Sequence, residues 1–190
     1  MKTAGILLAA GRSLRFGDQD KLMANLGGRP LVRHAVSTLV SLSPDILIAV
    51  ASSDDVAEEC DGFQLVRTAN SEIQQSTSLR LGILAAQERG ASRALVMLAD
   101  MPFVTTRHLQ AVLSNCTDTT ASASGDGVRR MPPACFPAKM FPDLAAIEGE
   151  TGARSILKSL PATSIIVTNQ EELHDIDTQA DLESAMRSLH

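Results

Sequence analysis

Short apolar stretches of strand length alternate with amphipathic stretches of helix length through more than half of the chain, and this alternation constrains the fold more than any other feature. Alternating strands and helices pack as parallel strands joined by right-handed crossovers, which places helices on both faces of one sheet. We therefore predict an α/β fold, a three-layer α/β/α sandwich with a Rossmann-like, mostly parallel sheet. The expected strands span residues 6–9, 45–51, 63–67 and 94–98, the expected helices span 30–42, 76–89 and 105–113, and Ser53, Asp54 and Asp55 cap a short further helix.

The pattern changes after Asp118. Two short β-like stretches, 119–124 and 134–136, flank a Gly-Asp-Gly turn and a pair of prolines, which predicts a partly antiparallel addition to the sheet. No linker or low-complexity segment interrupts the chain, so we expect one domain over residues 1–190. The remaining expected elements are helices at 138–147 and 153–160, a strand at 164–167 and a helix at 178–189.

Composition excludes several classes of function. The net charge is −5 and the chain has no Trp and no Tyr, so neither a basic surface nor stacking platforms for nucleic acid are expected. No apolar run reaches bilayer length and the N-terminus has no secretory pattern, so we expect no membrane partner and a cytoplasmic location. The three cysteines are far apart in the sequence, which argues against a disulfide framework or a zinc cluster.

The run Leu8-Ala9-Ala10-Gly11-Arg12-Ser13-Leu14-Arg15-Phe16-Gly17, followed by Lys21, carries the strongest functional signal. Small residues at the end of a buried strand let backbone approach a ligand closely, and two arginines and a lysine then follow in one short loop. Such a loop suits an anion, most plausibly a triphosphate. The run has neither the spacing of a Walker A loop nor the close glycine pair of a dinucleotide fingerprint. An exposed basic turn is the simpler alternative at this stage.

These residues resemble the signature of the molybdenum-cofactor nucleotidyltransferases, the MobA/MocA-like family, and especially its cytidylyltransferase-like branch. The resemblance continues at Ser76–Gly82, Leu98–Pro102, Gly149–Arg154 and Asp175–Thr178, so that it covers nearly the whole chain. It implies the fold of the nucleotide-diphospho-sugar transferases and a reaction in which an oxygen of the acceptor attacks the α-phosphorus of a nucleoside triphosphate.

Two aspartates are the expected ligands of Mg²⁺, the cofactor that the resemblance implies. Asp100 follows a buried strand, where a carboxylate is rigidly held and partly exposed, although strand-end aspartates also cap turns. Asp177 resembles the second metal ligand of the family, and Asp175 is the alternative because alternation puts both on the same side of an extended backbone. Helix capping is the simpler explanation for Asp177.

The resemblance also assigns roles around the nucleotide. Lys21, Arg15 and Asp100 are the expected catalytic residues. Lys21 would contact the α-phosphate, and Arg12, Ser13 and Arg15 would hold the β- and γ-phosphates. The nucleobase would lie between Ser78 and the backbone of Leu8, Ala9 and Ala10, with Gly11 also among the nucleotide-binding residues and CTP favoured over GTP. Arg154 would reach a substrate phosphate, and an exposed arginine at a helix N-terminus is the alternative.

We therefore expect transfer of CMP, or less favourably GMP, to a phosphorylated small molecule, molybdopterin in the first place. One departure concerns the acceptor: the family has Gly-His-Pro where this chain has Met131-Pro132-Pro133. A sugar or alditol phosphate is the alternative acceptor. A third possibility is that the protein is not catalytic, but binds nucleotide or cofactor and delivers it to a molybdenum hydroxylase. If the protein is an active transferase, a molybdenum hydroxylase is its expected transient partner.

Overall fold

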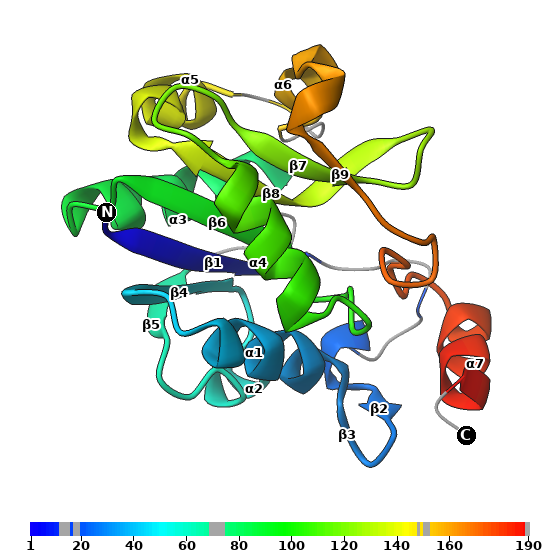
Figure 1. Cartoon of the computed structure of the whole chain (residues 1–190). Coiled ribbons are helices and arrows are strands. Elements are labelled where there is room, and N and C mark those ends of the chain that lie inside the picture. The colour runs from blue at the N-terminus through cyan, green and yellow to red at the C-terminus, as the bar shows by residue number, and fades with distance from the viewer. Residues whose placement is uncertain (12–15, 17–19, 69–74, 148, 150–152, 189–190) are drawn as a thin grey trace.

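A seven-stranded sheet runs through the centre of the structure, in the order β5-β4-β1-β6-β8-β7-β9 (Figure 1). The computed structural model describes all residues except 12–15, 17–19, 69–74, 148, 150–152 and 189–190. Within this sheet β8 runs antiparallel to both of its neighbours, whereas the other pairs are parallel. The strands are β1 (Thr3–Ala9), β4 (Ile46–Ala51), β5 (Gln64–Arg67), β6 (Arg93–Leu98), β7 (Ser122–Gly125), β8 (Arg130–Pro137) and β9 (Ile165–Val167).

The parallel half of the sheet brings three strand ends to one edge. β1 lies between β4 and β6, and Leu8 is in register with Val50 on one side and with Leu98 on the other. All three strands run in the same direction, so the loops that follow them leave the sheet side by side. The carboxyl ends of such strands are the usual place for ligands in open α/β sheets.

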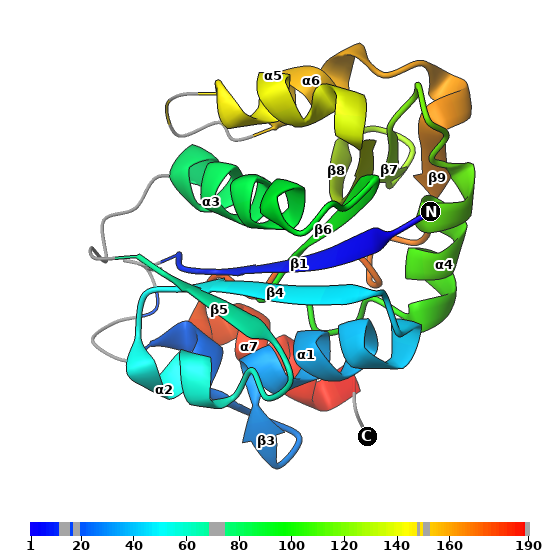
Figure 2. The same cartoon turned by 90° about the vertical axis from the view of Figure 1, so that its left-hand side faces the viewer.

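Helices cover both faces of this sheet (Figure 2). Because side chains alternate along a strand, Ala4 and Ile6 of β1 face α3, while Leu7 and Ala9 face α1 and α4. The two resulting apolar cores confirm the predicted three-layer α/β/α arrangement. The helices are α1 (Leu31–Leu42), α2 (Asp54–Glu58), α3 (Gln75–Glu88), α4 (Thr106–Asn115), α5 (Phe141–Ala145), α6 (Arg154–Ser159) and α7 (Gln179–Ser188).

The antiparallel addition is confirmed, but β8 is longer than the expected 134–136 and includes both prolines. The ladder with β7 shifts register: Ala123 is opposite Ala134, and the next residue, Ser124, is opposite Met131. The two prolines therefore lie in a bulge with no residue of β7 opposite them. Proline has no N–H to donate, so an interrupted ladder is where a strand accommodates it.

Other differences from the sequence prediction are local. The helix expected at 138–147 divides into a 3₁₀ helix, Ala138–Met140, and the short α5. A small hairpin, β2 (Asn25–Leu26) and β3 (Arg29–Pro30), precedes α1 and was not predicted. Among the described residues, no helix combines the length and the hydropathy that crossing a bilayer requires.

Candidate active site

Lys21 lies at the start of a 3₁₀ helix, Lys21–Met23, in the segment that follows β1. The side chain of Asp20 caps this turn by accepting a hydrogen bond from the backbone N–H of Leu22, 3.0 Å away. The hydroxyl of Ser53, beyond the end of β4, donates to the other oxygen of Asp20 at 3.3 Å. The turn that carries Lys21 is thus anchored to a neighbouring strand end.

The ammonium group of Lys21 lies between two carboxylates. Its Nζ is 2.7 Å from Oδ2 of Asp100 and 2.8 Å from Oδ1 of Asp177. The Lys21 side chain is 7 % exposed and that of Asp100 18 %, whereas that of Asp177 is 45 % exposed, so the ion pairs extend from the interior to the surface. Three residues predicted separately from three motifs therefore meet at one point.

Backbone contacts explain why Asp177 lies beside Asp100 despite their separation in the sequence. The N–H of Ile176 donates to the backbone carbonyl of Asp100 at 2.9 Å. The carboxylate of Asp181 then accepts from the N–H of Asp177 at 3.1 Å and from the N–H of Thr178 at 2.7 Å. Thr178 and Asp181 form a capping box at the start of α7, which fixes the backbone of the preceding residue.

The contact between Lys21 and Asp100, together with their burial, shifts the pKa values of both groups. Burial alone would lower the pKa of Lys21, but the charges and hydrogen bonds of Asp100 and Asp177 outweigh it and raise that pKa, so the ammonium stays charged. Burial raises the pKa of Asp100, and although Lys21 opposes this, the nearby charges of Asp175 and Asp177 add to it. Among the described residues, two carboxylates contact the one ammonium group of Lys21, so this group of three side chains is negative overall when all are ionised, which favours a further cation.

The donor set fits a divalent cation such as Mg²⁺. Oδ1 of Asp100 is buried and has no hydrogen-bond partner among the described residues, so it is an oxygen that a cation can use. Hard cations of this kind bind through one or two carboxylates and complete their coordination with phosphate oxygens and water. Among the residues that the structure describes, no group of three or more His, Cys, Asp or Glu side chains forms a metal cage of its own. Asp100 and Asp177 would therefore hold the cation together with a substrate.

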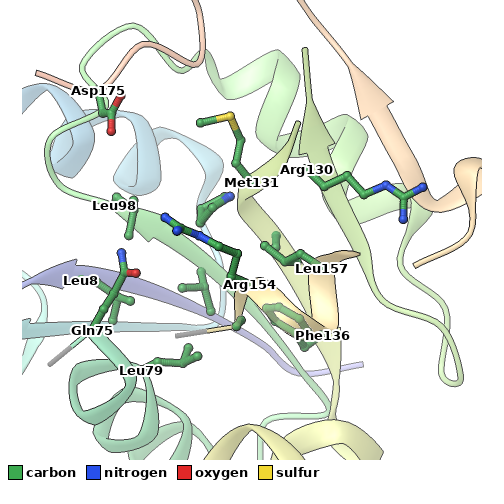
Figure 3. A pocket seen from close by; sticks show the side chains of 14 residues that line it. Leu8, Gln75, Leu79, Leu98, Arg130, Met131, Phe136, Arg154, Leu157 and Asp175 are labelled. Carbon is green, nitrogen blue, oxygen red and sulfur yellow. The ribbon is translucent and has the colours of Figure 1, made fainter. Parts of the chain in front are cut away.

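A pocket of about 150 Å³ opens beside these residues, on the face of the sheet that α3 and α6 cover (Figure 3). Its walls are largely apolar, with Leu8 on one side and Met131 on the other. The guanidinium group of Arg154, from the start of α6, points into it (Figure 3). Gln75 and Asp175 supply the other polar groups at its rim, whereas Arg130 turns its guanidinium away, toward carbonyl groups near the end of α6.

The structure places the remaining predicted residues as follows. Leu8 lines the pocket, while Ala9 and Ala10 are buried at the end of β1 and Gly11 is exposed directly after them. Ser78 is buried in α3 and does not line the pocket, unlike Gln75 and Leu79 of the same helix. Arg12, Ser13 and Arg15 lie outside the described residues.

From the sequence, Asp175 is only the alternative to Asp177 as a metal ligand, and Met131 and Pro132 are only a departure from the acceptor motif; neither is predicted to line a pocket. Asp175 lines the pocket, while Asp177 contacts Lys21, so one carboxylate belongs to the pocket and the other to the ion pairs. Met131 and Pro132 form a pocket wall because the bulge in β8 carries them there. Only the proline pair in the sequence signalled an irregularity at this point.

Comparisons with known proteins identify the family of the chain. The model of the MobA-like NTP transferase domain matches residues 5–172. The chain is 29 % identical to the purine catabolism protein PucB of Bacillus subtilis, over 97 % of this chain and 96 % of that protein. It is 26 % identical to a probable molybdenum cofactor guanylyltransferase of Mycolicibacterium paratuberculosis, over 96 % and 94 % of the two chains.

A similar solved structure is that of Rv0371c from Mycobacterium tuberculosis H37Rv, with a TM-score of 0.85 at 22 % identity and 98 % coverage of both chains. That protein has also been solved in complex with manganese. At this identity the likeness shows the fold alone. The family model, in contrast, matches most of the sequence, and the chain belongs to the MobA-like NTP transferase family. It is accordingly a nucleotidyltransferase, acting on a nucleoside triphosphate and a small-molecule acceptor.

Proposed function

We propose that the protein is a Mg²⁺-dependent nucleotidyltransferase that transfers CMP from CTP to a phosphorylated acceptor of the molybdopterin type. The observation that carries this proposal is the ammonium group of Lys21 held between Asp100 and Asp177 beside a pocket lined by Arg154. An ammonium group and two carboxylates lie together after the parallel strands, and a guanidinium group lines the neighbouring pocket. The resemblance to the cytidylyltransferase-like branch supplies the choice of CTP.

In this reaction a phosphate oxygen of the acceptor attacks the α-phosphorus of CTP. The bond from the α-phosphorus to the oxygen that bridges it to the β-phosphorus breaks, and pyrophosphate leaves with the electron pair. The protein contributes mainly position and electrostatic stabilisation, because no protein group need form a covalent bond. The ammonium group of Lys21 would stabilise the charge that develops on the α-phosphate. A divalent cation held by Asp100 and Asp177 would neutralise phosphate charge.

The acceptor would occupy the pocket. Its apolar walls suit a ring system, and Arg154 is the group that can bind an acceptor phosphate, since a guanidinium can donate two parallel hydrogen bonds to it. Leu8 and Gln75, on the opposite side, lie next to the expected nucleobase site. This order would bring the acceptor phosphate toward Asp100 and Lys21.

GTP is the second candidate nucleotide, because several similar proteins are named as guanylyltransferases. The same transferase mechanism would apply with either base, so the geometry around Lys21 does not separate them. A sugar or alditol phosphate remains the alternative acceptor, since the family's His is replaced here by Pro132.

A non-catalytic binding partner is less well supported. A protein that only delivered nucleotide or cofactor would not need a buried ammonium group between two carboxylates. Transient contact with a molybdenum hydroxylase is compatible with catalysis, because an enzyme of that class would receive the nucleotide form of the cofactor.

The test is a pyrophosphate-release assay with each of the four nucleoside triphosphates and Mg²⁺, carried out without acceptor, with molybdopterin and with a sugar phosphate. We expect release that requires molybdopterin and is fastest with CTP. An Asp100→Asn variant serves as the matched inactive control. Release that is fastest with GTP would move the proposal to guanylyl transfer, and release with a sugar phosphate but not with molybdopterin would replace the acceptor. No release under any of these conditions would refute the proposed catalysis.

A further inference from the structure

Three polar groups connect α4 to the bulge of β8 from the face of the sheet opposite the pocket. Nε2 of His108, in α4, lies 2.7 Å from Oγ of Ser124 in β7. The Ser124 hydroxyl donates to the backbone carbonyl of Pro133 at 2.8 Å. His108 is 6 % exposed and Ser124 is fully buried, so these bonds form in the interior.

The directions of the hydrogen bonds follow from the number of protons. Serine has one hydroxyl proton, and here it points to the carbonyl of Pro133, so the oxygen of Ser124 can only accept from His108. The imidazole must therefore carry its proton on Nε2. Burial lowers the pKa of His108, with the charge of Glu172 opposing it, which favours the neutral ring with this tautomer.

The carbonyl of Pro133 needs such a partner because of the bulge. At a regular position in the β7–β8 ladder a backbone N–H of β7 would be available, but the register shift leaves Pro132 and Pro133 with no residue opposite. A buried carbonyl without a hydrogen bond costs roughly 1–3 kcal/mol. The hydroxyl of Ser124 takes the place of the missing backbone donor.

The other side of the same bulge forms the pocket. Met131 and Pro132 line it, together with Ala134 and Phe136 from the following part of β8. Arg130, just before the bulge, donates to the backbone carbonyls of Lys158, at 2.7 Å, and Leu160. The wall is therefore held at its beginning by α6 and at its middle by Ser124.

We propose that His108 is a positioning residue of the active site, which acts through Ser124 and the Pro133 carbonyl to hold Met131 and Pro132 as the wall against which the acceptor packs. This inference rests on the proposed function, because it takes the pocket as the acceptor site. His108 itself touches neither substrate nor metal. Its loss should affect acceptor binding more than nucleotide binding or turnover.

The chain offers a matched control in the same strand. Ser122 and Ser124 are both fully buried, and the hydroxyl of each bonds to a residue of α4. The Ser122 hydroxyl donates to the backbone carbonyl of Val112 in α4 and makes no bond to β8 among those that the structure describes. Ser122→Ala thus removes a buried hydrogen bond of the same kind without touching the bulge.

The first experiment measures the environment of Met131 in the pocket wall by NMR and requires no enzymatic reaction. Protein labelled with ¹³C in the methionine methyl groups is compared for the wild type, Ser124→Ala, His108→Leu, His108→Gln and Ser122→Ala, with the Met131 signal assigned from Met131→Leu. We expect the Met131 signal to shift or broaden in Ser124→Ala and His108→Leu and to stay in place in Ser122→Ala. Gln can donate from its amide, so His108→Gln should restore much of the wild-type signal.

The second experiment measures KM for molybdopterin and for CTP in the same variants. We expect KM for molybdopterin to rise about tenfold in Ser124→Ala and His108→Leu, with KM for CTP and kcat changed less than about twofold, because small displacements of positioning groups have large effects on productive binding. A Met131 signal that moves equally in Ser122→Ala, or that moves in none of the variants, would overturn the proposal. A shifted signal with unchanged KM for molybdopterin would overturn its functional half. Absence of transfer in the wild type would instead contradict the proposed function, and the methyl spectra would still decide whether His108 holds the wall.

Discussion

Replacement of Lys21 by Met gives a direct test of the buried ion pairs. The side chain keeps nearly its length and loses only its charge and its donors. Two unit charges 2.7 Å apart attract by about 6 kcal/mol at an effective dielectric constant of about 20, but the cost of desolvating both groups cancels part of this. Removing one member of such a pair leaves the other charge buried, and we expect a loss of about 3 kcal/mol, at the lower end of the usual range because Asp100 keeps some exposure.

The pH dependence of this loss follows from Asp100. Burial already raises the pKa of its carboxyl in the wild type, and without the ammonium group that pKa rises further. Between the unfolded value of about 3.9 and this higher folded value, the folded variant binds a proton that the unfolded chain does not bind. Stability of the variant therefore increases as the pH falls, and its deficit relative to the wild type should shrink as the pH is lowered from neutral toward the unfolded-state pKa of about 3.9.

The measurement is urea unfolding followed by far-UV circular dichroism, because the chain has no Trp or Tyr to report by fluorescence. Lys139→Met is the control, because it is the same substitution made at an exposed lysine. We also expect turnover of Lys21→Met to fall by about 10²–10³, the usual effect of losing one group that stabilises transition-state charge. A deficit equal to that of Lys139→Met, or one that grows on acidification, would refute the reasoning.

Three further predictions address the metal site, the core and the thiols. Asp100→Asn should weaken Mn²⁺ binding in the presence of nucleotide by about tenfold or more, as measured by calorimetry. The control is Asp61→Asn, which should leave Mn²⁺ binding unchanged because the Asp61 side chain is 85 % exposed. Equal effects of the two substitutions would show that Asp100 is not a metal ligand. Gly82→Ala would place a Cβ 2.7 Å from Cγ2 of Ile6, so the free energy of unfolding should fall by about 1 kcal/mol or more, and an unchanged melting temperature would contradict this close packing. Burial raises the pKa of the Cys60 thiol to about 11, so alkylation of Cys60 at about pH 8, followed by mass spectrometry, should be at least about tenfold slower in folded than in urea-unfolded protein.

The parallel half of the fold could be predicted from the sequence because its signals are local. Each buried strand appears as an apolar run, and each helix shows its own spacing and caps, as with Ser53 before α2 and Thr105 before α4. The convergence of Lys21 and Asp100 also followed, since both residues come soon after strands whose carboxyl ends share one edge.

The pocket wall could not be predicted in the same way. A bulge is a property of two strands, and nothing in the sequence around Met131 states which residue of β7 lies opposite it. The choice between Asp175 and Asp177 likewise depends on distant partners, namely the backbone carbonyl of Asp100 and the capping box at α7. The hairpin formed by β2 and β3 did have a signal, two glycines with positive φ between short strands, but two-residue strands are too short to show alternation.

The antiparallel part of the sheet, which begins at β7 and β8, carries the pocket wall, and this suggests how acceptor preference can be changed. The residues after α4 and before Asp175 form one continuous stretch, 117–174, which contains β7, β8, β9, α5 and α6, and hence the pocket wall and Arg154. Lys21, Asp100 and Asp177 all lie outside it. Under the proposed function, this stretch is a natural unit for exchange between relatives, with the nucleotide machinery left intact. Such a chimaera would need α4 matched to the incoming β7, because the contacts of His108 with Ser124 and of Val112 with Ser122 cross the boundary of the exchanged unit.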